Sequence, residues 1–149
     1  MTTLKPKYKP FPMNLLSQPD NNLQTYTGNC HCGHIQFTVT ISPPFPEHQV
    51  ASCNCSICRR NGYLLIYPLR ENVTITKGDG QEGQYRFNRR KATHKFCGRC
   101  GSSVFVDFNG QEAKDVIGVN VRLLNGVDLD DLALRFVDGA SHPGEYRVD

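Results

Sequence analysis

Seven cysteines, gathered in three short groups, constrain this chain of 149 residues more than any other feature. An odd number of thiols leaves at least one without a partner in the chain, and a disulfide within Cys-x-Cys would be strained. In a reducing compartment such clusters indicate metal binding or catalysis, and a disulfide framework is the minor alternative. The groups are Cys30 and Cys32 in NCHCGH, Cys53, Cys55 and Cys58 in SCNCSICRRNG, and Cys97 and Cys100 in FCGRCGS.

The first and last groups together provide one complete set of metal ligands. Cys-x-x-Cys followed by glycine is the pattern of a zinc knuckle, and Gly98 and Gly101 permit the tight turn that it needs. A structural zinc ion takes four ligands, and each outer pair alone would be half a site. The simplest assignment is a structural zinc on what we call the four-cysteine site: Cys30, Cys32, Cys97 and Cys100.

The central group then provides three ligands from a single loop. Three protein ligands and one free position are typical of catalytic zinc. Three thiolates outweigh the charge of the ion and weaken it as a Lewis acid, so it suits a soft fourth ligand such as a substrate thiolate. The predicted catalytic zinc lies on the three-cysteine site: Cys53, Cys55 and Cys58. The alternative is a closed site with a histidine from elsewhere: His31, His34, His48 or His94.

Apolar patterning predicts one mainly β domain of short strands over residues 27–149, after an irregular arm over residues 1–26 that contains four prolines. A helical turn is indicated only in residues 122–132, and Asn109-Gly110 has the composition of a hairpin turn. Seven segments have a strand pattern, either alternating or continuously apolar: 34–41, 63–68, 72–78, 83–88, 103–108, 116–121 and 132–137.

Composition limits the classes of partner. Lys and Arg exceed Asp and Glu by 17 to 14, and a net charge of +3 does not by itself indicate a nucleic-acid-binding protein. No apolar run approaches the roughly 18 residues that cross a bilayer, and the first residues lack the apolar core of a signal peptide. We therefore expect a cytoplasmic protein with no membrane partner, and the sequence leaves the oligomeric state open.

Basic residues near the three-cysteine site suggest an anionic substrate. Arg59 and Arg60 directly follow Cys58, and the run NRRK at 88–91 precedes the second knuckle. These cations could bind the carboxylates of a small thiol, or they could be solvated loop charges.

Four segments resemble the glutathione-dependent formaldehyde-activating enzyme and centromere protein V family: TGNCHCGHIQFTV, CNCSICRRNGYL, YRFNRRKATHKFCGRCGSSVF and VNVRLLNGVDLDDL. The resemblance extends from Thr27 to Gly139. It implies an Mss4-like fold (a β-tent), in which stacked antiparallel sheets are pinned by zinc. It also implies two zinc ions per chain on the same structural and catalytic cysteine sets. The activity that it implies is that of a carbon–sulfur lyase, which joins glutathione and formaldehyde to S-(hydroxymethyl)glutathione.

A proton must move in such a reaction, and His94 and Tyr63 are the candidate groups, although a histidine before a knuckle is as often a packing residue. Many family members have a histidine where this chain has Asn54. Two other functions remain open. One is a non-catalytic zinc module that contacts a protein or nucleic acid through NRRK and the basic residues Lys5, Lys7 and Lys9. The other is zinc-assisted chemistry on a metabolite larger than formaldehyde.

Overall fold

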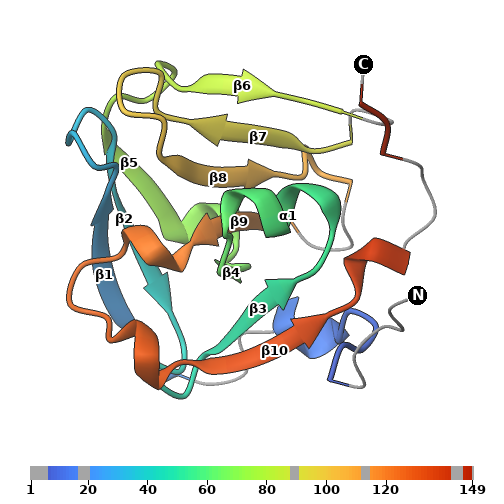
Figure 1. Ribbon diagram of the computed structural model, residues 1–149. Helices are drawn as coiled ribbons and strands as arrows, with labels where there is room; N and C mark the ends of the chain where they lie inside the picture. The colour runs from blue at the N-terminus through green and yellow to red at the C-terminus, as the bar shows by residue number, and fades with distance from the viewer. Residues whose placement is uncertain (1–6, 17–20, 88–90, 112–114, 142–145, 149) are drawn as a thin grey trace.

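The computed structural model describes residues 7–16, 21–87, 91–111, 115–141 and 146–148 (Figure 1). Lys5 and the part of NRRK at 88–90 lie outside these residues. Within them, no helix is long and apolar enough to cross a membrane. The fold is mainly β, as predicted, and consists of two sheets.

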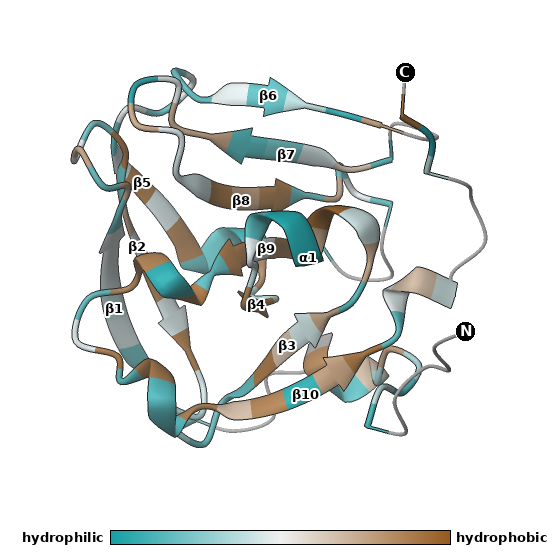
Figure 2. Ribbon diagram, in the orientation of Figure 1, coloured by the Kyte–Doolittle hydropathy of each residue, from teal (hydrophilic) through white to brown (hydrophobic). Residues whose placement is uncertain are grey.

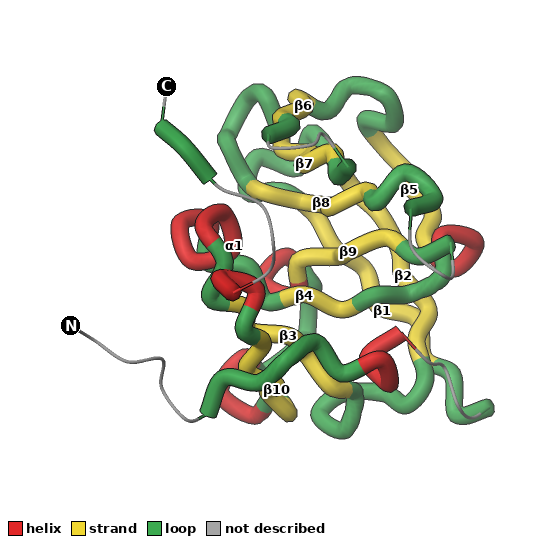
Figure 3. Tube along the Cα trace, turned by 90° about the vertical axis from the view of Figure 1, so that its right-hand side faces the viewer, coloured by secondary structure: helices red, strands yellow, loops and turns green. Residues whose placement is uncertain are grey.

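The smaller sheet has three antiparallel strands in the order β1 (Gln24–Asn29), β2 (Gln36–Ile41) and β5 (Val73–Lys77). The larger sheet has seven, and Figure 3 shows how they follow one another across the molecule. Their order is β10 (Ala133–Val137), β3 (Gln49–Cys53), β4 (Leu65–Ile66), β9 (Ile117–Asn120), β8 (Ser103–Asp107), β7 (Thr93–Phe96) and β6 (Gly83–Tyr85). All neighbours in both sheets are antiparallel except β10 and β3, which are parallel.

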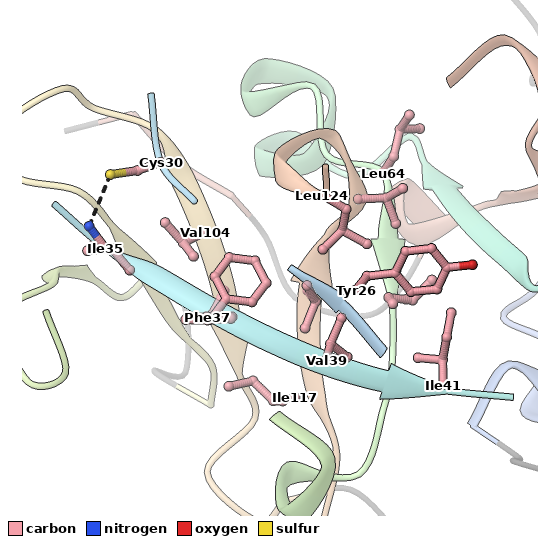
Figure 4. Packing of buried hydrophobic residues seen from close by; sticks show 14 of the residues in the cluster. Tyr26, Cys30, Ile35, Phe37, Val39, Ile41, Leu64, Val104, Ile117 and Leu124 are labelled. Atoms are coloured by element: carbon pink, nitrogen blue, oxygen red, sulfur yellow. Dashed lines mark hydrogen bonds between the residues drawn. The ribbon is translucent and has the colours of Figure 1, made fainter. Parts of the chain in front are cut away.

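The main core lies between the two sheets. Every second residue of β2 is buried, as its alternating pattern predicted, and these residues face the large sheet. The ring of Phe37 on β2 packs edge-on against Phe105 on β8, with their centroids 4.9 Å apart. Figure 4 shows this layer continuing from Cys30 at one end to Ile41 and Tyr26 at the other. The cysteine is thus part of the core, and any ion held there is anchored to it.

The opposite face of the large sheet carries a second core. Neighbouring residues of one strand alternate between the cores: Val50 and Ile66 belong to the first, and Ala51 and Leu65 to the second. This second core also contains Cys58. Each cysteine site is therefore attached to a different core.

Three strands were not predicted: β1, β3 and β7. Apolar and polar residues do not alternate clearly in their sequences. In β1, for example, only Tyr26 and Gly28 are buried. That strand also starts at Gln24, inside the segment predicted to be an irregular arm. The arm itself is partly ordered: Leu15, in a short 3-10 turn (η1, Met13–Leu16), is buried, and the backbone of Lys9 bonds to Phe136 and Asp138 on either side of the end of β10.

The single α-helix of the described residues, α1 (Ser56–Asn61), was missed as well. Along the chain it follows β3 and precedes β4, and in Figure 1 it lies in front of the large sheet. Figure 2 shows that its last turn is strongly hydrophilic. The predicted helical turn at 122–132 is instead two 3-10 turns, η3 (Val121–Leu123) and η4 (Leu129–Asp131). Between them Gly126 has a φ of 74°, which interrupts any continuous helix. The remaining 3-10 turns are η2 (Arg70–Asn72) and η5 (Gly139–Ser141).

Candidate metal centres and the adjoining cleft

The four-cysteine site joins two strand ends that are far apart in the sequence. Cys30 follows β1 and Cys97 follows β7. The Sγ atoms of Cys30 and Cys32 are 3.7 Å apart, as are those of Cys32 and Cys97, and all four Sγ atoms lie within 4.8 Å of one another. A tetrahedron of sulfurs about 2.3 Å from its centre has edges of about 3.8 Å. The four thiols are therefore spaced to hold one tetrahedral metal ion.

Backbone groups support this site as in a knuckle. The N–H of Ile35 donates to Sγ of Cys30 over 3.2 Å (dashed line in Figure 4), and the N–H of Arg99 donates to Sγ of Cys97 over 3.4 Å. Gly101 has a φ of 81°, the left-handed conformation expected for the glycine after the second cysteine. Cys30 and Cys97 are fully buried, whereas Cys32 is exposed. An ion here would link the small sheet to the large one.

The three-cysteine site is built from one continuous strand–turn–helix segment. Cys53 is the last residue of β3, Cys55 is the N-cap of α1, and Cys58 lies within α1. The Cys55 sulfur accepts a hydrogen bond from the backbone N–H of Cys58 over 3.4 Å, so it caps the helix in place of the usual oxygen. The three Sγ atoms lie within 4.8 Å of one another. The C-x-C-x-x-C spacing thus brings three potential ligands together without help from distant parts of the chain.

The electrostatics of these three thiols favour a cation. Hydrogen bonds from Cys53 and Cys58 lower the pKa of Cys55, and donating to Cys53 and Cys55 raises the pKa of Cys58, with burial adding to the increase. One thiolate is therefore stabilised at the expense of its neighbours. A metal ion would compensate all three negative charges at once.

Among the described residues, no histidine, aspartate or glutamate joins the three-cysteine site. Nδ1 of His34 is 3.3 Å from the guanidinium of Arg99, beside the other site, and Nδ1 of His48 is 3.0 Å from the carbonyl of Pro43. Neither completes the set, and His142 lies outside the described residues. The described part of the site therefore offers three sulfurs.

A structural role of Asn54 was not foreseen from the sequence. Its side-chain N–H donates to Asp138 over 3.0 Å, and its oxygen accepts from the backbone N–H of Ala140 over 2.9 Å. These bonds hold the segment after β10 against the cysteine loop. At Gly139 a side chain would overlap the sulfur of Cys53, so the fit depends on the absence of a Cβ atom.

A cleft of about 450 Å³ opens beside the three-cysteine site. Ser56 and Ile57, which follow Cys55, form part of one wall. Arg60 also lines the cleft, with its guanidinium 5.2 Å from the ring centre of Tyr146 and bonded to the carbonyl of Ser56. Arg59 is exposed and is not among the lining residues. The full set of lining residues is Ser56, Ile57, Arg60, Asn61, Tyr63, Gln84, Tyr85, Phe87, His94, Phe96, Gly101, Ser103 and Tyr146.

The two predicted proton-transfer residues meet in this cleft. The hydroxyl of Tyr63 is 3.1 Å from Nδ1 of His94, and both side chains are buried. Burial raises the pKa of Tyr63 and lowers the pKa of His94, while the charge of Cys55 acts on His94 in the opposite direction. Both groups are therefore expected to be neutral near pH 7, and a neutral hydroxyl–imidazole pair can pass a proton.

Comparison with known proteins agrees with this geometry. The sequence model described as glutathione-dependent formaldehyde-activating enzyme matches residues 25–133, a range that contains all seven cysteines, Tyr63 and His94. A protein of Halomonas elongata with the provisional name glutathione-dependent formaldehyde-activating enzyme is 30% identical over 87 residues, which are 53% of this chain and 54% of that protein. The chain thus spans about half the length of this relative. A crystal structure of a Rhodobacter sphaeroides protein superposes with a TM-score of 0.63 at 29% identity, covering 74% of this chain and 98% of the other.

Proposed function

Because the chain belongs to the glutathione-dependent formaldehyde-activating enzyme family, we propose that it is a zinc-dependent carbon–sulfur lyase that joins a thiol to a small carbonyl compound. Glutathione and formaldehyde are the reactants in the name of the matching family. The observation that carries the proposal is the three-cysteine site, three clustered thiols beside a cleft that contains a buried tyrosine–histidine pair.

Zinc is the metal proposed for both sites. Sulfur-only ligand sets suit zinc, and the sulfur spacing of the four-cysteine site agrees with zinc–sulfur bonds of about 2.3 Å. We assign a structural ion to Cys30, Cys32, Cys97 and Cys100 and a catalytic ion to Cys53, Cys55 and Cys58. The catalytic ion would keep the substrate thiol deprotonated at neutral pH, because a thiolate is the better fourth ligand.

Tyr63 and His94 would transfer the proton in this reaction. When the thiolate sulfur bonds to the carbonyl carbon, the carbonyl oxygen gains negative charge and takes up the proton that the thiol lost. The hydroxyl of Tyr63 can donate to that oxygen, and His94 can supply the replacement proton or hold it in the reverse direction. Burial of the pair excludes water from this transfer.

Arginine residues would hold the anionic ends of the thiol. Arg60 lines the cleft and can bind a carboxylate of glutathione, and the exposed neighbour Arg59 can contribute only at the rim. The non-catalytic alternative relied on NRRK and on Lys5, Lys7 and Lys9, of which Lys5 and residues 88–90 lie outside the described residues.

The reaction can be measured directly. Exchange NMR of glutathione with ¹³C-formaldehyde reports the rate at which the adduct forms and breaks. The protein with zinc bound should accelerate the exchange, and Cys58→Ser should remove the acceleration while the four-cysteine site keeps its metal. A fully metal-loaded protein with no effect on the exchange would refute the proposed activity.

A further inference from the structure

The cleft beside the three-cysteine site is larger than its smallest proposed reactant requires. Formaldehyde has two heavy atoms and occupies about the space of one or two water molecules, roughly 30–60 Å³. The cleft has a volume of about 450 Å³, which is in the range of sites for much larger ligands. Either the thiol fills the remainder or the carbonyl compound carries a substantial group.

The lining of the cleft favours the second explanation. Four rings form a row from solvent to the reaction site: Tyr85, Phe87, His94 and Tyr63. Successive centroids are 5.9, 5.6 and 5.9 Å apart, and successive planes differ by only 18°, 32° and 28°. Tyr85 is 48% exposed at the outer end, and Tyr63 is 3% exposed at the inner end. The rings therefore present a nearly continuous aromatic wall.

Tyr146 adds to the aromatic surface. Its ring meets Phe87 edge-on at 90°, with the centroids 6.1 Å apart, and it is 40% exposed. Large aromatic side chains that remain exposed together around a concave site usually serve a ligand rather than the fold. The arrangement offers flat faces and edges, which are the surfaces against which another aromatic ring packs well.

Glutathione does not match this wall. The tripeptide has two carboxylates and one ammonium group, so its ends require charged or strongly polar partners. Of the described residues that line the cleft, Arg60 alone carries a permanent charge, and Ser56, Asn61, Gln84 and Ser103 offer further polar groups. These residues can hold the polar ends of the thiol, but glutathione has no aromatic ring, so the aromatic wall has no counterpart on it.

Building on the function proposed above, we propose that the carbonyl reactant is an aldehyde bearing an aromatic ring, which packs along Tyr85 and Phe87 with its carbonyl group directed at Tyr63. In the reaction the thiolate sulfur bonds to the aldehyde carbon, the π pair of the C=O bond moves to oxygen, and oxygen takes the proton released by the thiol. The product is the hemithioacetal, and no other reactant is needed.

The test compares two aldehydes at constant glutathione in the zinc-loaded protein. The probes are formaldehyde and 4-nitrobenzaldehyde, and exchange NMR gives kcat/KM for each. The aromatic aldehyde should have the higher kcat/KM. Tyr85→Ala should lower that value about five- to tenfold, the contribution of one aromatic contact, and leave the value for formaldehyde within about twofold. Tyr85→Phe, which keeps the ring, should retain the rate.

Tyr8→Ala is the matched control, since Tyr8 packs on Phe136 away from the cleft and should alter neither value. Turnover of formaldehyde without 4-nitrobenzaldehyde would overturn the aromatic assignment and leave the proposed function standing. A rise in KM for glutathione in Tyr85→Ala, equal with both aldehydes, would assign the wall to the thiol and also overturn it. If neither aldehyde reacts, the proposed function fails, and this inference fails with it.

Discussion

The hydroxyl of Tyr63 and Nδ1 of His94 lie 3.1 Å apart in a buried contact between the loop after α1 and strand β7. The two rings also stack, with an angle of 28° between their planes. The contact joins residues 31 positions apart in the sequence and fixes both rings beside the three-cysteine site. The two residues that the sequence suggested for proton transfer are therefore hydrogen-bonded to each other.

Tyr63→Phe should separate catalysis from folding. The variant keeps the buried ring and removes the group proposed to donate a proton, so kcat should fall by about 10²-fold, the usual contribution of a general acid. Metal content should not change, and the melting temperature should fall only by the few degrees that correspond to one lost hydrogen bond, about 1 kcal/mol. Tyr67→Phe is the matched control, because Tyr67 is a buried tyrosine of the same core that does not line the cleft. A Tyr63→Phe enzyme with normal kcat would remove this residue from the mechanism.

The two metal sites should differ in how strongly the fold depends on them. Cys97→Ser breaks a site that joins both sheets at a fully buried position, and binding energies of about 10–16 kcal/mol for such ions rival the stability of the domain. We expect insoluble or molten protein. Cys55→Ser should stay folded, because serine is a good N-cap for α1, and should lose one of two ions. Circular dichroism and metal analysis check both; equal destabilisation would contradict the assignment.

Asn54 is expected to fix the segment after β10 against the cysteine loop. Asn54→Ala removes hydrogen bonds to Asp138 and Ala140 and should destabilise the protein by about 1–3 kcal/mol. Hydrogen exchange of residues 138–141 should increase, and metal should be lost more readily from the three-cysteine site. Asn125→Ala removes hydrogen bonds of similar length to Thr27 and Asn29 and is the control. Unchanged hydrogen exchange at residues 138–141 would show that Asn54 does not hold this segment in place.

Acid stability should depend on Asp107. Burial raises the pKa of this carboxyl, but hydrogen bonds from Arg70 and the backbone N–H of Asn109 outweigh it and lower the pKa from 3.8 to about 2. Because the folded state binds the proton less readily than the unfolded state, the stabilisation is complete above about pH 4 and is lost as the pH falls toward 2. Asp107→Asn should therefore cost stability at pH 7 and much less near pH 2.

Urea unfolding of wild type and Asp107→Asn at a series of pH values measures this difference, with metal content determined at each pH and the two proteins compared only where both keep their metal. Asp115→Asn is the control, since Asp115 bonds the same Arg70 from a side chain that is 61% exposed and should contribute little. A stability gap between wild type and Asp107→Asn that does not narrow in acid would contradict the assignment.

The sequence predicted how the cysteines group, because the spacing within each group is local and a closed structural site needs four ligands, which the two outer pairs together provide. It predicted β2 because half of that strand is buried, and it missed β1, whose side chains are mostly exposed. Helix α1 has six residues, too few to show a period, and begins at a cysteine rather than at a common capping residue. The row from Tyr85 to Tyr63 could not be predicted, because pairing of β6 with β7 and the position of α1 create it.

From the sequence alone, Arg59 and Arg60 were predicted to have the same role in substrate binding, since both directly follow Cys58. The structure distinguishes them: consecutive helical residues point about 100° apart, and only Arg60 reaches the cleft. We therefore expect Arg60→Ala to weaken glutathione binding by about 1–3 kcal/mol, the value of a charged hydrogen bond. Arg59→Ala should have a smaller effect.

The most direct test of the account is the response of the cobalt-substituted protein to glutathione. If the three-cysteine site holds an ion with a position for a thiol, glutathione should enter as a fourth sulfur ligand. The thiolate-to-metal absorption of the wild type should then increase. Cys58→Ala should lose that increase while the absorption of the four-cysteine site persists. A wild-type spectrum that does not change at millimolar glutathione would contradict the claim that this site binds the substrate thiol.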